Sequence, residues 1–537
     1  MTTRRTPARG MATATAVVTL LAGCQFSAPG PGTSTPPGFV LPTITHTVDG
    51  GSSPDRTRHV TSDAVPDGMV PAPRGSGYQR YFNQSLTWGQ CADENAAQAG
   101  MECAAFLAPL DWADPDGQWA ITVAMSRFPH TTGEGRILFV NPGGPGGSAQ
   151  DYAQRFPREG LEAFDIVGLD PRGSGESTPV VCGDGPQTDA FLLSDATPDD
   201  EAERSVFQDA QAGFNRLCRE HSGVLLDHIS SVQAVHDHDL ARRLMGREKF
   251  SFHGVSYGTY LGSLMAELYP GRLEAAVLDS AVMLDPEDET IQAEGFDLAL
   301  WAFADWCSQQ DNCSLGSSPG QVVDAIVGYV DSLDASPVPA GEGRMLTQSL
   351  AVSGILVFLY FNSEAYPQLA NVLLAAVNGH PDFLLQAADL MNDRDADGSY
   401  DTLMYAFPAI RCADEADEGI TAAWQEWEKN QTRAPVFGRL SGVDLVCPLW
   451  TAVPDPVPDF SAKEAPPLLV VQNTGDSATP FHNAEVMAAK LETATLVVRE
   501  SAGHGAFGDG SSCIDQIVVD YLVNGDVPAE GTRCTDG

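Results

Sequence analysis

The pentapeptide Gly254-Val255-Ser256-Tyr257-Gly258 restricts the fold of this chain more than any other feature of the sequence. It has the pattern G-x-S-x-G, and it follows an apolar run at 250–252 and precedes a helical pattern at 260–269. Small residues on both sides of the serine allow a sharp turn from a strand into a helix, and this turn exposes the hydroxyl. The segment therefore predicts a buried strand, a strained turn with Ser256 at its tip, and a following helix.

Short apolar runs alternate with helical patterns beyond residue 100, as in a mainly parallel sheet that helices cover on both faces. The expected strands are 119–125, 137–140, 164–169, 250–252, 275–278, 468–471 and 494–498. Several of these runs end in glycine-rich or acidic turns. Ligands of open α/β sheets bind at the carboxyl ends of the strands, so we expect the chemistry to cluster at that edge.

The interval between the strands at 275–278 and 468–471 is far longer than the usual connection of about two to six residues. It contains helical patterns at 296–307, 321–333, 350–359, 366–377 and 420–427. We therefore expect a mainly helical lid inserted above the strand ends. The expected division of the chain is a leader at 1–23, a tether at 24–75, a core in two parts at 76–284 and 461–537, and the lid at 285–460.

Ser256 needs a base to remove its proton, and in folds with this type of turn the acid and then the histidine follow the serine along the chain. Asp476 lies on the turn after the strand at 468–471, and His504 lies on the turn after the strand at 494–498. We predict that His504 is the base and that Asp476 orients its imidazole and stabilises its charged form. His253 is the alternative base, but strand alternation points its side chain away from the pocket.

A glycine-rich loop, Asn-Pro-Gly-Gly-Pro-Gly-Gly-Ser at 141–148, follows the strand at 137–140. Such a loop directs backbone N–H groups into the site, so we predict an oxyanion hole formed by the N–H groups of Tyr257 and Gly144. No lysine follows the loop, which argues against a nucleotide-phosphate site. The turn Asp-Pro-Arg-Gly-Ser-Gly at 170–175 is expected to be structural, with Arg172 paired inside the protein.

The amino terminus has the features of an export signal. Three arginines precede an apolar run at 11–21, which is shorter than the about 20 residues that a membrane span needs. The run ends in Leu21-Ala22-Gly23-Cys24, which resembles the processing box of bacterial lipoproteins and predicts a lipid on Cys24. We expect an exported protein, at the cell surface or extracellular, that meets the membrane only through this anchor. An ordinary signal peptide with an incidental Cys24 is the alternative.

The 11 cysteines leave an even set of ten once Cys24 is assigned to lipid, and an even set in an exported chain argues for disulfides. Pairing between neighbours along the chain is our hypothesis among many possible connectivities of Cys91, Cys103, Cys182, Cys218, Cys307, Cys313, Cys412, Cys447, Cys513 and Cys534.

Metal binding is disfavoured by the spacing of the candidate ligands. The cysteines lack a zinc-finger pattern, and the close pair His236-Asp237-His238 is expected on an exposed charged face. The acidic run at 393–398 resembles the start of a calcium loop, but Met404 occupies the position that requires a bidentate glutamate. We therefore expect neither a metal nor a cofactor.

Composition excludes two broad classes. The chain of 537 residues has 30 Lys plus Arg against 72 Asp plus Glu, a formal net charge of −42 that would repel a nucleic-acid backbone. Its hydrophobic fraction of 43% allows a packed core, which argues against disorder throughout the chain.

Together, the glycine loop at 141–148, the turn at 170–175, the elbow at 254–259, Asp476 with Thr479-Pro480, and Gly503-His504-Gly505 resemble the α/β-hydrolase superfamily. Within it, the chain is similar to the exported tripeptidyl-aminopeptidase-like serine peptidases of actinobacteria, which are relatives of prolyl aminopeptidase. The resemblance covers residues from about 90 to 537. It implies an α/β-hydrolase fold with a helical cap, and cleavage of short peptides from a free amino terminus without a metal.

An exopeptidase of this kind requires an acid in the lid, because a desolvated ammonium group needs a charged partner. The segment 409–415 resembles the cap segment that lies near the site in this family, so Asp414 and Glu415 are the candidates, with Glu364 a weaker one. We expect peptide substrates and assume a monomer. The alternatives are an esterase or lipase with the same triad and, less favoured, a binding protein on an inactive hydrolase scaffold.

Overall fold

The structure is a computed structural model that describes residues 41–42, 68–285, 288, 290–361, 363–415 and 417–535. The predicted leader, Cys24 and most of the predicted tether lie outside the described residues. Within those ranges, none of the helices combines the length and the apolar character that crossing a membrane requires.

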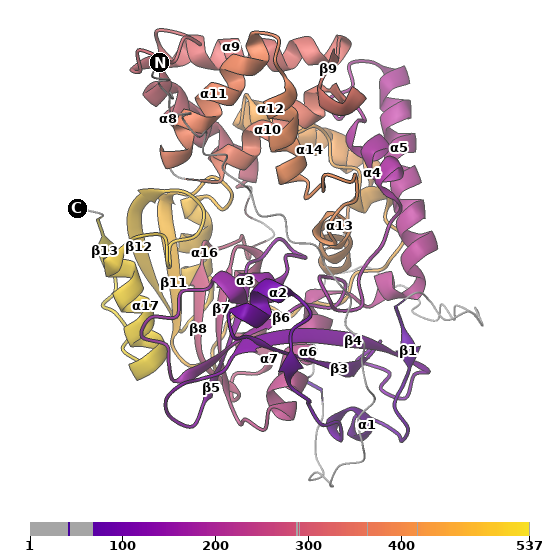
Figure 1. Ribbon diagram of the computed structural model, residues 1–537, viewed down its shortest axis with the longest axis vertical. Helices are drawn as coiled ribbons and strands as arrows, with labels where there is room; N and C mark the ends of the chain where they lie inside the picture. Colours follow the sequence, from indigo (N-terminus) through magenta and orange to yellow (C-terminus); the bar gives the residue numbers. More distant parts are fainter. Residues whose placement is uncertain are drawn as a thin grey trace, which may run out of the picture.

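A sheet of 11 strands forms the body of the described chain, in the order β13-β12-β11-β8-β7-β5-β6-β4-β3-β2, with β1 beside β4 (Figure 1). All pairs from β6 to β13 are parallel, whereas β1 to β4 add antiparallel pairs at the other end. The strands are β1 (Val70–Pro71), β2 (Gly89–Gln90), β3 (Glu102–Pro109), β4 (Trp119–Phe128), β5 (Arg136–Asn141), β6 (Phe164–Leu169), β7 (Phe250–Val255), β8 (Leu273–Asp279), β11 (Leu468–Gly475), β12 (Ala494–Ala502) and β13 (Arg533–Cys534). The prediction of a mainly parallel α/β sheet is confirmed.

The register of the central strands brings their carboxyl ends into one row. Asn141 of β5 lies opposite Gly254 of β7, and Asp279 of β8 lies opposite both Val255 of β7 and Val471 of β11. The turns that follow these strands therefore meet at one edge of the sheet. This edge receives the glycine loop, the serine elbow and the turn that carries Asp476.

Helices cover both faces of the sheet, which explains why the central strands are almost entirely apolar and buried. Buried side chains of α6 (Ser231–Leu244), α7 (Tyr257–Leu268) and α16 (Phe481–Lys490) share one hydrophobic cluster with the sheet. Side chains of α3 (Ala149–Arg155) and α17 (Ser512–Asn524) belong to a second cluster, on the other face.

The long interval between β8 and β11 is helical, as predicted, and lies above the carboxyl edge of the sheet (Figure 1). Most of these helices pack around their own hydrophobic cluster, which includes Phe303, Ile326, Leu350 and Leu373. The helices are α8 (Gln292–Ser308), α9 (Pro319–Ala335), α10 (Gln348–Leu359), α11 (Tyr366–Val377), α12 (Asp382–Met391), α13 (Leu403–Asp414), α14 (Ile420–Arg433) and α15 (Phe437–Leu440).

Two helices cross the expected boundary between core and lid. The buried side chains of α13, including Tyr405 and Ile410, belong to the cluster of the sheet and not to that of the lid. In the opposite sense, α5 (Glu201–Ser222) belongs to the first part of the core in the sequence but begins beside the lid (Figure 1), where its Phe207 packs with Val443 and Leu445. With 22 residues, α5 is long enough, at about 33 Å, to reach both layers.

The folded body also begins earlier than the sequence suggested. Val70 and Pro71, assigned by the sequence to the flexible tether, form β1 and pair with Ala120 and Trp119 of β4. The tether prediction of 24–75 therefore runs too far at its carboxyl end.

All ten cysteines assigned to disulfides are joined, each to its neighbour in the sequence, as the pairing hypothesis required. The five bonds are Cys91–Cys103, Cys182–Cys218, Cys307–Cys313, Cys412–Cys447 and Cys513–Cys534. Two of them act where helices cross between layers, because Cys218 belongs to α5 and Cys412 belongs to α13.

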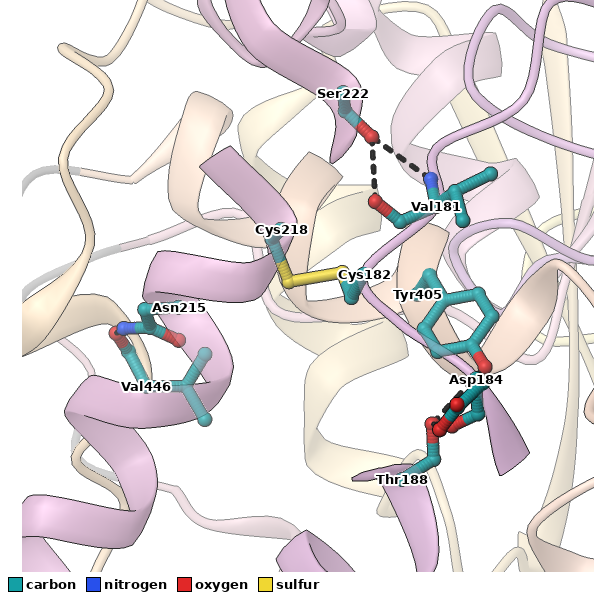
Figure 2. Close-up of a disulfide and its surroundings, with 9 residues drawn as sticks. All are labelled: Val181, Cys182, Asp184, Thr188, Asn215, Cys218, Ser222, Tyr405 and Val446. Carbon is teal, nitrogen blue, oxygen red and sulfur yellow. Dashed lines mark hydrogen bonds between the residues drawn. A yellow bond between two sulfur atoms is a disulfide. The ribbon is translucent and has the colours of Figure 1, made fainter. Parts of the chain in front are cut away.

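Figure 2 shows the surroundings of the Cys182–Cys218 bond, near the carboxyl end of α5, where this helix joins the core. Both cysteines are fully buried. Near this bond, the hydroxyl of Thr188 on α4 (Gly185–Leu192) lies 3.0 Å from the hydroxyl of Tyr405 on α13. The disulfide holds the segment before α4 against α5, and the hydrogen bond connects α4 with α13.

Candidate active site

Ser256 lies at the tip of the turn between β7 and α7, with φ 58° and ψ −125°. A positive φ is unusual for a residue with a side chain and costs about 1 to 3 kcal/mol, which the surrounding structure must hold. The turn is held by close packing: a Cβ on Gly254 would come within 2.3 Å of the carbonyl oxygen of Gly258. The predicted strained elbow is present at the carboxyl edge of the sheet.

Asp476 and His504 are in direct contact. The Nδ1 of His504 lies 2.9 and 3.0 Å from the two carboxylate oxygens of Asp476, which follows β11 directly. The Asp476 carboxylate is buried and also accepts hydrogen bonds from the N–H and hydroxyl of Thr479, at 2.9 and 3.0 Å. The structure thus brings together the acid and base that the sequence predicted, and a hydrogen bond to Nδ1 leaves Nε2 for the serine.

The charges of this pair stabilise each other. Burial opposes ionisation of Asp476, but the adjacent His504 and the hydrogen bonds hold the pKa of Asp476 below its usual value. Burial also opposes protonation of His504, but Asp476 outweighs it and raises the pKa of the imidazole. Within the described residues, Ser256 and His504 make no hydrogen bond to each other; such bonds commonly tighten when substrate binds.

The loop that carries His504 is held by the end of β8, a contribution that the sequence did not reveal. The carboxylate of Asp279 accepts hydrogen bonds from the N–H groups of Ala506 and Phe507, at 3.0 and 2.9 Å. The hydroxyl of Ser280 accepts one from the N–H of Gly505 at 2.8 Å. The only sign of this role in the sequence is that two polar residues, Asp279 and Ser280, end a buried strand. The loop that they bind lies more than 220 residues away in the sequence.

Two further contacts hold the same loop. The side-chain amide of Asn473 in β11 donates to the carbonyls of Gly503 and Gly505, at 2.9 and 2.8 Å. From the lid, the carbonyl of Tyr360 accepts a hydrogen bond of 3.0 Å from the N–H of His504. The Tyr360 ring also contacts the imidazole edge-on, with ring centroids 5.7 Å apart. The base is therefore fixed by the core and the lid together.

The glycine loop lies directly against the elbow. A Cβ on Gly143 would come within 2.5 Å of the Val255 carbonyl oxygen and 3.0 Å of the Tyr257 nitrogen, so only glycine fits there. Among the described residues, the N–H groups of Gly144 and Tyr257 donate to no acceptor. Both are available for a developing negative charge on a substrate.

Asp414, at the end of α13, reaches the elbow through hydrogen bonds. Its carboxylate accepts from the N–H and the hydroxyl of Ser231, at 2.7 and 2.5 Å, and the Ser231 hydroxyl contacts the hydroxyl of Tyr257. Burial raises the pKa of Asp414 to about 7. Glu415 is exposed, next along the chain, and Arg411 pairs with Asp444 nearby.

A cavity of about 390 Å³ lies on another side of the base. His504 lines it, together with Phe358, Tyr360, Phe361, Glu364 and Gln368 of the lid. These lid residues come from the end of α10, the short 3₁₀ helix η3 (Ser363–Ala365) and the start of α11. Glu364, the weaker candidate for the amino terminus, thus lies at this cavity.

The His236-Asp237-His238 segment is not the exposed charged face that the sequence suggested. It lies in the buried helix α6. The charge of Asp237 can be buried there because Asp237 forms a bidentate ion pair with Arg172, at 2.7 Å for both bonds, and both side chains have 0% exposure. The expectation that Arg172 pairs internally is confirmed. The described residues contain no group of three or more His, Cys, Asp and Glu side chains arranged to hold a metal ion.

His253, the alternative base, is fully buried among aromatic rings, including those of Phe156 and Phe507. Burial lowers its pKa to about 3, so the imidazole stays neutral. Its position agrees with the prediction that strand alternation directs it away from the elbow.

Comparison with known proteins identifies the family. Residues 136–305 match the model described as alpha/beta hydrolase fold, and residues 434–534 match the model described as TAP-like protein. The chain is 31% identical over 482 residues to serine protease Hip1 of Mycobacterium tuberculosis, which covers 84% of this chain and 91% of that protein.

Two other relatives align over a similar length. Tripeptidyl aminopeptidase of Streptomyces lividans is 28% identical over 479 residues, or 85% of this chain and 87% of that protein. Carboxylesterase B of M. tuberculosis is 31% identical over 481 residues, or 83% of this chain and 89% of that protein. The chain therefore belongs to the TAP-like serine peptidases of the α/β-hydrolase fold.

Proposed function

We propose that this protein is an exported serine aminopeptidase that releases di- or tripeptides from free amino termini through an acyl-enzyme. The observation that carries the proposal is the chain of contacts from the carboxylate of Asp414 on α13, through Ser231, to Tyr257, the residue that follows the serine. These contacts support the proposal, because they hold a carboxylate of α13 close to the elbow, within reach of a short bound peptide.

Ser256, His504 and Asp476 form the catalytic triad in this proposal. His504 removes the proton of the Ser256 hydroxyl as the oxygen attacks the peptide carbonyl, and then delivers this proton to the departing amine. Asp476 keeps Nδ1 protonated and stabilises the imidazolium, in accord with the raised pKa of His504. Water then attacks the acyl-enzyme by the same route in reverse.

The N–H groups of Tyr257 and Gly144 form the oxyanion hole. The close approach of Gly143 to the elbow supports this assignment, because it places the next residue of the loop beside the serine. Donors that are already oriented towards the developing charge require no rearrangement during the reaction.

Asp414 binds the substrate ammonium group, and Glu415 adds a second negative charge at the same end of α13. A partly desolvated carboxylate gains most from a cation, because the ion pair relieves the cost of its own burial. Its pKa of about 7 in the free protein would then fall when substrate binds.

We further propose that residues 285–460 act as a lid and that Cys24 carries the lipid anchor. The remainder of the predicted tether, up to β1, would then hold a monomeric enzyme at the cell surface. Without the anchor, the enzyme would be extracellular. The disulfides support an oxidising compartment, since such bonds persist mainly outside the cytosol.

Esterase activity is the second candidate, because one relative over a similar length is named carboxylesterase B. The same serine, histidine and oxyanion donors hydrolyse esters. The distinguishing feature is the end of α13: Asp414 offers a partner to an amine, whereas a lipid esterase would need a wide apolar groove at this position.

The test compares chromogenic tripeptide amides that are free or acetylated at the amino terminus, alongside acyl esters, with Ser256→Ala as control. We expect free peptides to be cleaved about 10- to 100-fold faster than acetylated ones, since acetylation removes the charged hydrogen bond to Asp414. Equal rates for the two would reject the aminopeptidase proposal. Activity of Ser256→Ala would reject the triad.

A further inference from the structure

The cavity beside His504 has no role in the reaction as proposed so far. It is lined by the imidazole itself and by residues of α10, η3 and α11, whereas Asp414 reaches the elbow from α13. The α10–α11 part of the lid therefore contacts His504, whereas α13 contacts the elbow through Ser231 and Tyr257. Ser256 is not part of the cavity lining.

The chemistry of acyl transfer gives this side a role. The amine that leaves during acylation takes its proton from the imidazole, so its nitrogen lies next to His504 at that moment. The side chain attached to this nitrogen must extend past the imidazole. In the proposed reaction, the acyl part of the substrate extends towards the oxyanion donors and Asp414.

The lining indicates which side chains fit. Phe358, Tyr360 and Phe361 supply three aromatic rings, and Phe361 is 59% exposed at the cavity rim. Aromatic surfaces of this kind gain free energy when they cover an apolar side chain. The cavity volume of about 390 Å³ is ample for a single phenylalanine or leucine side chain.

The charged groups at the cavity add a second criterion. Asp509 also lines the cavity, but its carboxylate pairs with Arg499 at 2.8 Å, so its charge is compensated. Glu364 contributes a further carboxylate at the exposed rim. An acidic side chain in the cavity would meet this carboxylate and be repelled.

From these observations we infer that the cavity is the binding site for the first residue of the departing peptide, with preference for an aromatic or aliphatic side chain and against an acidic one. This inference rests on the proposed acyl-enzyme reaction. It extends that proposal from the released amino-terminal piece to the residue on the other side of the cleaved bond.

The inference can be tested on the acyl-enzyme directly. A p-nitrophenyl ester of a tripeptide, or p-nitrophenyl butyrate, forms the acyl-enzyme and releases nitrophenol. An added amino acid amide then competes with water: its nitrogen bonds to the acyl carbon, the bond from that carbon to Ser256 Oγ breaks, and the amine proton passes through His504 to Oγ. The ratio of amide product to hydrolysed acid, measured by chromatography, reports binding of the amine in the cavity.

We expect phenylalaninamide and leucinamide to be captured about ten-fold more efficiently than glycinamide, and the α-amide of glutamic acid to be captured least. Phe361→Ala removes most of the preference for phenylalaninamide. Phe383→Ala is the matched control, because Phe383 on α12 is 57% exposed in the same lid but does not line the cavity. Glu364→Gln increases capture of the glutamic acid amide.

Equal capture of all amines, or the same loss of preference in Phe361→Ala and Phe383→Ala, would overturn the inference. If nitrophenol release is normal in that case, the acyl-enzyme proposal stands while the subsite is rejected. If no ester gives an initial burst of nitrophenol and no capture product forms, both proposals fail. The separate comparison of free and acetylated peptides decides the role of Asp414 independently.

Discussion

In the proposed reaction, Asp414 and His504 must both be deprotonated, whereas low pH protonates them. The Asp414 carboxyl must be ionised to bind an ammonium group, and burial raises its pKa to about 7. The His504 imidazole must be neutral to accept the serine proton, although Asp476 raises its pKa despite burial. Both groups therefore become inactive as the pH falls.

For the wild-type protein, we expect KM for a free tripeptide amide to rise as the pH falls below about 7, while kcat falls through the protonation of His504. In Asp414→Asn, KM is raised about 10- to 100-fold at high pH and loses its pH dependence, because a charged hydrogen bond is lost. The acid limb of kcat remains. Separate measurements of kcat and KM between about pH 5 and 9 test this.

Ester hydrolysis provides the control for this variant, since an ester without an amine does not use Asp414. Unchanged ester hydrolysis by Asp414→Asn would show that the elbow is intact. A peptide KM equal to that of the wild type would contradict the role of Asp414.

Among the elements, the glycine loop has the least freedom to change. Gly143 has φ +93°, and a Cβ there would approach the backbone of the elbow to within 2.5 Å. A side chain would therefore move either the loop or the serine turn, and with it the N–H groups proposed as oxyanion donors. The loop and the elbow come this close because they follow β5 and β7, which are paired in the sheet.

We expect Gly143→Ala to lower kcat about 100- to 1,000-fold, the effect of losing one oxyanion donor. Gly246→Ala is the matched control, because Gly246 also has a positive φ, +71°, but nothing within 4 Å of the added Cβ. That control costs about 1 kcal/mol of stability through backbone strain. Steady-state kinetics with thermal melts separate the two effects, and equal kcat values in the two variants would refute the argument.

The whole molecule depends on how α5 and α13 connect its two layers. The buried face of α13 packs on the sheet, while its carboxyl end carries Asp414 and is joined by Cys412 to Cys447. On the glycine loop, Leu403 and Ala406 of α13 lie against Gly144 and Gly146. The geometry of the proposed substrate site thus depends on α13 and the glycine loop, which lie far apart in the sequence.

Removal of the Cys412–Cys447 bond by serine substitution of both residues is expected to reduce stability by roughly 4 kcal/mol, from the closure of a loop with a sequence separation of 35. It should also raise KM for peptides, because α13 positions Asp414. Removal of Cys307–Cys313, with a separation of 6, is the control and costs roughly 2 kcal/mol.

Denaturant unfolding and peptide kinetics of the two double variants check this prediction. The expected contrast is a higher peptide KM only in the Cys412–Cys447 variant, with ester hydrolysis by both close to that of the wild type. The same peptide KM in both variants would refute a positioning role for this bond.

The elbow, the glycine loop and the order of Ser256, Asp476 and His504 could be predicted because each depends on a few neighbouring residues. A strand followed by G-x-S-x-G, or an acid directly after an apolar run, is visible within about ten residues. Helices of the lid were likewise indicated by their apolar spacing. The burial of residues 236–238 could not be predicted, because charged residues in a segment without a visible partner suggest exposure, and the partner of Asp237 is the distant Arg172.

The sequence by itself determined the fold class, the serine elbow and the family of this protein. Only the tertiary structure decided that Asp279 and Ser280 hold the histidine loop, that α5 joins the lid while α13 joins the core, and that a cavity lies beside His504. The physical reason is the distance along the sequence between the residues that are in contact. Local patterns encode local turns, whereas these contacts join residues far apart in the chain, and their partners become neighbours only when the strands align.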